Sequence, residues 1–98
     1  MGDGMKLQIV EQFWAVEAPT RTTNKVLVPL TLGRVPGMER WSMFFTIDTI
    51  TDDAVEVTVH YKDEKYNQTW TVTEDCGIYY RPISMDGGYE YYLDLKRK

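Results

Sequence analysis

The chain has 98 residues, which is the usual size of one domain, and we expect a single domain over residues 1–98. Its residues are 43% hydrophobic and 13% aromatic, so an intrinsically disordered chain is excluded because there is ample apolar surface to bury. The formal net charge of −4 argues against nucleic acid as a partner, since an acidic body repels polyanions.

The first half of the chain contains three strand candidates rich in Val, Ile, Thr and aromatic residues. Pro29 falls within the second of them, and because proline has no backbone N–H this strand suits a sheet edge or a bulge. We expect strands at residues 7–17, 25–32 and 40–50, with loops at residues 18–24 and 33–39 between them.

These strands are apolar on both faces, which is unusual for one sheet that is open to solvent on one side. Alternation places Val10 and Trp14 on one face of the first strand, and Leu7, Ile9 and Phe13 on the other. Phe44 likewise lies opposite Phe45 and Ile47. Either the strands run through a closed barrel or sandwich, or one face is covered by another chain. We therefore expect a homo-oligomer in which Val10, Trp14 and Phe44 are candidate interface residues.

The second half is more regular. Residues 55–61 alternate between apolar and polar without a break, and residues 66–73 do the same after a polar turn at 62–65. A further turn at 74–77 precedes strands at 78–83 and 89–95, and Asp86-Gly87 suits a type I′ hairpin turn between them. We predict a four-stranded antiparallel meander over residues 54–95. The fold class is then all-β, with about seven antiparallel strands in a small sandwich or barrel.

Symmetric turns predict the register of the meander. Val57 should face Trp70, Tyr80 should face Leu93, and Arg81 should face Tyr92. One face is then predicted to be core, comprising Val55, Val57, Val59, Tyr61, Tyr66, Trp70, Val72, Ile78, Tyr80, Tyr91, Leu93 and Leu95. The other is predicted to be solvated, comprising Glu56, Thr58, His60, Asn67, Thr69, Thr71, Thr73, Tyr79, Arg81, Glu90, Tyr92 and Asp94.

The sequence offers little catalytic chemistry. His60 and Cys76 are the only residues of their kinds, and the predicted register separates them by roughly 20 Å, too far for a thiolate–imidazole pair. They cannot supply the three or four ligands of a zinc site, and we expect no metal and no cofactor. A single cysteine excludes an intramolecular disulfide and fits a reducing compartment. No apolar run approaches the length of a membrane helix, so we expect a cytoplasmic protein with no membrane partner.

Acidic residues gather in two turns that the meander places at the same end of the sheet. Asp52 and Asp53 occupy one turn, and Glu74 and Asp75 the other. Four carboxylates could bind Ca²⁺ or support hydrolysis, but neither an EF-hand spacing nor a nucleophile motif accompanies them. We interpret them as solvated turn residues and expect no enzymatic activity.

The aromatic residues on the solvated face give the best functional indication. Tyr79, Arg81 and Tyr92 should lie together there, with His60 on the same face, and Tyr and Arg are enriched where proteins bind one another. The leading hypothesis is a non-catalytic interaction or assembly module that binds a protein or self-associates. The alternative is a carbohydrate- or small-ligand-binding β-module that stacks sugars on these rings.

Overall fold

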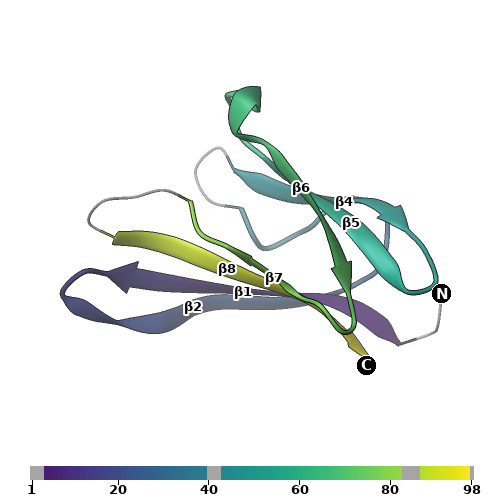
Figure 1. The fold of residues 1–98 in the computed structure, drawn as a ribbon, viewed down its shortest axis with the longest axis horizontal. Coiled ribbons are helices and arrows are strands. Elements are labelled where there is room, and N and C mark those ends of the chain that lie inside the picture. The colour runs from purple at the N-terminus through teal and green to yellow at the C-terminus, as the bar shows by residue number, and fades with distance from the viewer. Residues whose placement is uncertain (1–3, 40–42, 83–86, 98) are drawn as a thin grey trace.

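The computed structural model describes residues 4–39, 43–82 and 87–97 and contains two antiparallel sheets of four strands each (Figure 1). Sheet A has the strand order β2-β1-β8-β7 and sheet B the order β3-β4-β5-β6. The all-β sandwich is confirmed, and these strands do not close into the alternative barrel. The elements are β1 (Met5–Ala15), β2 (Ala18–Pro29), β3 (Gly33–Arg34), β4 (Phe44–Ile50), β5 (Ala54–His60), the 3-10 turn η1 (Glu64–Tyr66), β6 (Gln68–Thr73), β7 (Ile78–Tyr80) and β8 (Gly87–Arg97).

The centre of sheet A is an antiparallel ladder between β1 and β8. It runs without a register shift from Met5, opposite Arg97, to Ala15, opposite Gly87. Alternate β1 residues face sheet B, where Leu7 and Ile9 are fully buried. The two sheets diverge toward the tip of the β1–β2 hairpin (Figure 1).

The predicted loop at residues 18–24 is wrong, because β2 begins at Ala18 and forms a long hairpin with β1. The β-branched residues of this stretch favour a strand, although its polarity suggested a loop. β2 pairs with β1 alone and is therefore the edge strand that Pro29 requires. Thr23 is an extra residue at a register shift opposite β1, which is the arrangement of a β-bulge.

The predicted meander over residues 54–95 is wrong as a single sheet. β5 and β6 pair in sheet B, whereas β7 and β8 pair in sheet A, so the 74–77 connection crosses between the sheets. The first hairpin has the predicted register, with Val57 opposite Trp70. The second is shifted by two residues, placing Tyr79 opposite Tyr92 and Tyr80 opposite Tyr91. Asp86, half of the predicted turn, lies outside the described residues.

The core lies between the sheets and follows the predicted faces closely, because a two-residue shift leaves every side chain on its own face. Two assignments fail. Tyr66 was expected in the core but lies in η1 with 57% of its surface exposed, and Glu90 was expected in solvent but is only 7% exposed. The buried core comprises Met5, Leu7, Ile9, Val28, Val35, Met38, Met43, Phe45, Ile47, Val55, Val57, Val59, Val72, Tyr80, Tyr91, Leu93 and Leu95.

A carboxylate is buried on the inward face of β1. Glu11 is 1% exposed, and its oxygens accept hydrogen bonds from the Tyr91 hydroxyl at 2.8 Å and the Thr23 hydroxyl at 3.1 Å. A buried polar group is tolerated only when such donors replace water. The bulge at Thr23 therefore has a structural purpose, since it brings a donor to Glu11.

Among the described residues, no helix has the length and apolar character needed to cross a bilayer.

Replacing Gly87 by Ala should destabilise the fold strongly. Gly87 has φ +148°, and an added Cβ would lie 2.6 Å from the Trp14 carbonyl oxygen and 2.9 Å from the Ala15 Cα atom. We expect a loss of about 3 kcal/mol in the free energy of unfolding, measured by urea denaturation, from backbone strain and overpacking together.

Gly33→Ala is the matched control, because Gly33 also has a positive φ of +115° but an added Cβ there meets open space. It should lose about 1 kcal/mol from backbone strain alone. Equal losses in the two variants would contradict the packing of Gly87 against β1.

Candidate functional site

The outer face of sheet A carries a row of side chains across three strands. Tyr92 of β8 is the register partner of Val10 on one side and of Tyr79 on the other. The rings of Tyr79 and Tyr92 lie 4.9 Å apart between centroids with an interplanar angle of 41°. Tyr79 is 50% exposed and Tyr92 is 37% exposed, so both rings are available at the surface.

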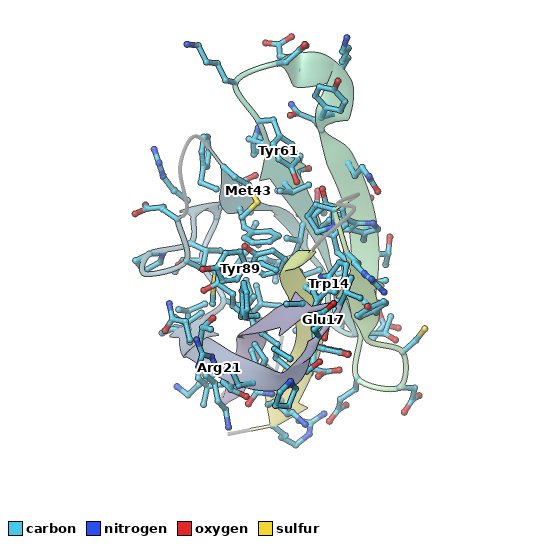
Figure 2. The ribbon with its side chains drawn as sticks, turned by 90° about the vertical axis from the view of Figure 1, so that its left-hand side faces the viewer. Trp14, Glu17, Arg21, Met43, Tyr61 and Tyr89 are labelled. Carbon is cyan, nitrogen blue, oxygen red and sulfur yellow. The ribbon has the colours of Figure 1, made fainter. Side chains whose placement is uncertain are left out.

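Trp14 lies on the same outer face, toward the tip of the β1–β2 hairpin. Trp14 and Tyr89 project from opposite sides of sheet A (Figure 2). The Arg81 guanidinium carbon lies 3.7 Å from the centroid of the Trp14 ring, which is a close cation–π contact. Trp14 is consequently only 9% exposed, although it does not belong to the core cluster. We call Trp14, Tyr79, Arg81 and Tyr92 the aromatic–arginine cluster.

Glu90 links the cluster to the sheet beneath it. The Tyr79 hydroxyl donates a hydrogen bond to Glu90 Oε1 at 2.6 Å. This bond is the main reason that the pKa of Tyr79 is raised, because ionisation would remove the donor and place a second negative charge beside the carboxylate. The neighbouring Arg81 lowers the same pKa but does not outweigh Glu90. Tyr79 is therefore held in one orientation as a neutral phenol.

Arg81 forms no ion pair among the described residues. In the described part of the chain, ion pairs join Arg34 to Glu39, Lys65 to Asp63 and Arg97 to Glu74, and none involves Arg81. Its guanidinium is covered on one side by the indole of Trp14 and hydrogen-bonds Tyr79, which leaves the remaining N–H groups at its edge as donors.

The prediction that His60 shares this surface is wrong. His60 ends β5 in sheet B, on the opposite outer face of the sandwich. Its ring stacks on Phe44 with centroids 4.8 Å apart and an interplanar angle of 9°, and its Nε2 lies 2.8 Å from the Thr46 hydroxyl. The sequence could not show this, because alternation fixes the face of a strand but not the sheet to which the strand belongs.

The three candidate interface residues also divide between the sheets. Val10 and Trp14 lie on the outer face of sheet A, and Phe44 lies on that of sheet B. Phe44 is covered by Arg34, whose guanidinium carbon lies 3.9 Å from the ring centroid. The outward-facing Trp14 and Phe44 are thus each shielded by an arginine of the same chain, and together with Val10 they do not form one continuous patch.

The acidic turns and Cys76 form no site of their own. Glu74 accepts two hydrogen bonds of 3.0 Å from the Arg97 guanidinium, which hold the pKa of this carboxyl below its usual value. No three His, Cys, Asp or Glu side chains within residues 4–39, 43–82 and 87–97 are placed to hold a metal ion. Cys76 is exposed and follows β6, at the other end of the β5–β6 hairpin from His60.

Comparisons with protein-family models, with curated proteins and with solved structures find no match to this chain. The functional argument therefore rests on the aromatic–arginine cluster. Sequence reasoning identified three of its four members, and it missed Trp14 because nothing in the turns indicates that β1 pairs with β8.

Replacing Glu90 by Gln should lower the pKa of Tyr79 toward its ordinary value of 10.0, because the charged acceptor that favours the protonated phenol is removed. The pKa can be followed through the Tyr79 ¹³Cζ resonance in an NMR titration. Glu56→Gln makes the same change on the exposed face of sheet B and should leave this pKa unaltered. An unchanged pKa in Glu90→Gln would contradict the hydrogen bond.

Proposed function

We propose that this chain is a non-catalytic protein-interaction module that binds its partner on the aromatic–arginine cluster of sheet A. One observation carries the proposal: two exposed tyrosine rings lie beside an arginine whose guanidinium lies over a tryptophan ring and forms no ion pair among the described residues. Tyr, Trp and Arg are the residue types that contribute most binding energy at protein interfaces.

The chemistry of Arg81 favours an acidic partner residue. A guanidinium presents a planar fork of N–H donors that matches the two oxygens of a carboxylate. Stacking on Trp14 already restricts the Arg81 side chain, so less conformational entropy remains to be lost on binding. We expect the partner to place an Asp or Glu side chain against the free edge of Arg81.

The tyrosine pair favours an apolar contact next to that carboxylate. Tyr79 is fixed through its hydroxyl by Glu90, and Tyr92 packs against it. Rigid aromatic rings provide contact area at low entropic cost. Val10 extends this surface on the far side of Tyr92. The preferred partner segment therefore carries an apolar residue near its acidic one.

Binding of a separate partner is favoured over self-association. The apolar surplus that suggested a second copy is covered within the chain, since Arg81 shields Trp14 and Arg34 shields Phe44. The chain is also acidic overall, with a net charge of −4, and like-charged copies repel one another. Light scattering at several concentrations should therefore show a monomer.

Carbohydrate binding is the second candidate function, because the exposed Tyr79 and Tyr92 rings could stack on sugar faces. Arg81 lies beside them as a hydrogen-bonding side chain. Binding of a neutral sugar does not require the positive charge of Arg81, whereas binding of an acidic peptide does. A glycan array on which the wild type binds and Tyr92→Ala does not would favour carbohydrate over protein.

A phage-displayed random peptide library, selected against the intact protein, tests the leading proposal. Enriched peptides should contain Asp or Glu next to an apolar residue. The dissociation constant of a selected peptide should rise about tenfold or more in Arg81→Gln, because removing one partner of a charge-assisted hydrogen bond costs at least about 1.5 kcal/mol. Tyr92→Ala should weaken binding by a similar factor, since interface aromatics often exceed 1 kcal/mol.

The control is Thr69→Ala, which alters an exposed residue on the opposite sheet and should leave peptide affinity unchanged. Enrichment of peptides without acidic residues, or equal affinity of selected peptides for the wild type and Arg81→Gln, would refute the proposed surface.

A further inference from the structure

A groove of about 350 Å³ opens where the end of sheet B meets the edge of sheet A. Tyr61, which lies just below η1 in Figure 2, and residues of η1 line the groove from the β5–β6 connection. Tyr80 and Arg81 line it from the end of β7. This volume lies within the range of small-molecule sites. The groove lies at the seam between the two sheets, apart from the Tyr92 ring and the outer face of sheet A.

The groove is lined by aromatic rings. Tyr61 and Tyr66 meet edge to face with centroids 6.2 Å apart and an interplanar angle of 73°. The Tyr80 ring packs against Trp70, with the two ring centroids 4.8 Å apart. Three tyrosines arranged in this way suit a planar apolar group, which stacks or packs edge-on against them.

The tyrosine hydroxyls also provide a hydrogen-bond donor. The hydroxyls of Tyr61 and Tyr80 bond to each other, and one proton is sufficient for that bond. The proton of the other hydroxyl remains available for an acceptor in the groove. Burial raises the pKa of both groups, so they stay neutral and add no negative charge at physiological pH.

The charges at the groove are positive. Lys65 and Arg81 are the cationic residues among its described lining residues, and none of those residues is a carboxylate. The Arg81 guanidinium, however, lies over Trp14 and bonds to Tyr79 on the outer face of sheet A. Lys65 has Asp63 at 3.8 Å, but both side chains are more than half exposed, and such pairs contribute little. The positive charge that the groove itself offers is therefore that of Lys65. The groove therefore favours an anion over a neutral or cationic ligand.

We propose that this groove binds a small aromatic carboxylate, with its ring against Tyr61, Tyr66 and Tyr80 and its carboxylate toward Lys65 and the free hydroxyl proton of the Tyr61–Tyr80 pair. The site is additional to the protein-binding surface on sheet A. Arg81 lines the groove, but its guanidinium belongs to the surface on sheet A, so the test of the groove uses Lys65.

Phenylacetate is a suitable probe, with phenylacetamide as its neutral analogue and acetate as its ring-free analogue. The indole N–H resonance of Trp70 reports on the groove, because Trp70 packs directly behind Tyr80. In an NMR titration, phenylacetate should shift this resonance saturably with a dissociation constant of about 1 mM, the range expected for so small a ligand. Phenylacetamide and acetate should each bind at least about fivefold more weakly, since each lacks one of the two contacts.

Variants separate this site from the surface on sheet A. Lys65→Gln should weaken phenylacetate binding about fivefold, the upper value of an exposed ion pair. Lys62→Gln removes the same charge three residues away from a side chain that does not line the groove, and it should leave the affinity unchanged. Tyr92→Ala should weaken peptide binding on sheet A about tenfold while phenylacetate binding is unchanged.

Circular dichroism and thermal unfolding of each variant show whether its fold is retained. Tyr66→Phe is a second control variant, at an exposed residue of the groove. It should bind phenylacetate with unchanged affinity because the aromatic ring remains. The proposal is overturned if phenylacetate produces no saturable shift of the Trp70 resonance. It is equally overturned if phenylacetamide binds as tightly as phenylacetate, or if Lys62→Gln and Lys65→Gln weaken binding alike.

Discussion

The ladder between β1 and β8 is the interaction on which the rest of the structure depends. It joins the first strand of the chain to the last in the middle of sheet A and gives β2 and β7 a strand to pair with. It also aligns Tyr91 with the buried Glu11, and Tyr92 with Val10. The pairing is among the most distant in the sequence, so the loop that it closes is entropically costly and the burial of Leu7, Ile9 and Leu93 must offset it.

Alternation along single strands could be predicted from the sequence, whereas the assignment of strands to sheets could not. The alternation of apolar and polar residues correctly placed Val55, Val57 and Val59 in the core. The predicted faces of β7 and β8 also stayed correct although their predicted register was wrong by two residues, because a shift of two leaves each side chain on its own face. The turn at 74–77 resembles a hairpin turn in composition, yet it joins different sheets. Local turn chemistry does not encode that choice, which is made by how two apolar faces pack.

The candidate site shows the same division. Tyr79, Arg81 and Tyr92 were predicted to meet because they lie on neighbouring strands of one hairpin. Trp14 was predicted to share a face with Val10 as a candidate interface residue, but its contact with Arg81 depends on the long-range pairing of β1 with β8. That contact covers the outward-facing ring of Trp14. An arginine from a distant strand covers the ring, and the same side chain then presents its charge at the surface.

The register of β1 against β8 also fixes where the chain enters and leaves the sandwich. Met5 and Arg97 are directly paired, so both strands reach the same end of sheet A (Figure 1). Trp14 lies about 30 Å farther along β1, at roughly 3.3 Å per residue. Adjacent entry and exit points are the geometry that allows a domain to be inserted into a surface loop of a host protein. Grafted in this way, the sandwich would extend away from its host, with Trp14 near its distal end and the Tyr79–Tyr92 pair about halfway along sheet A.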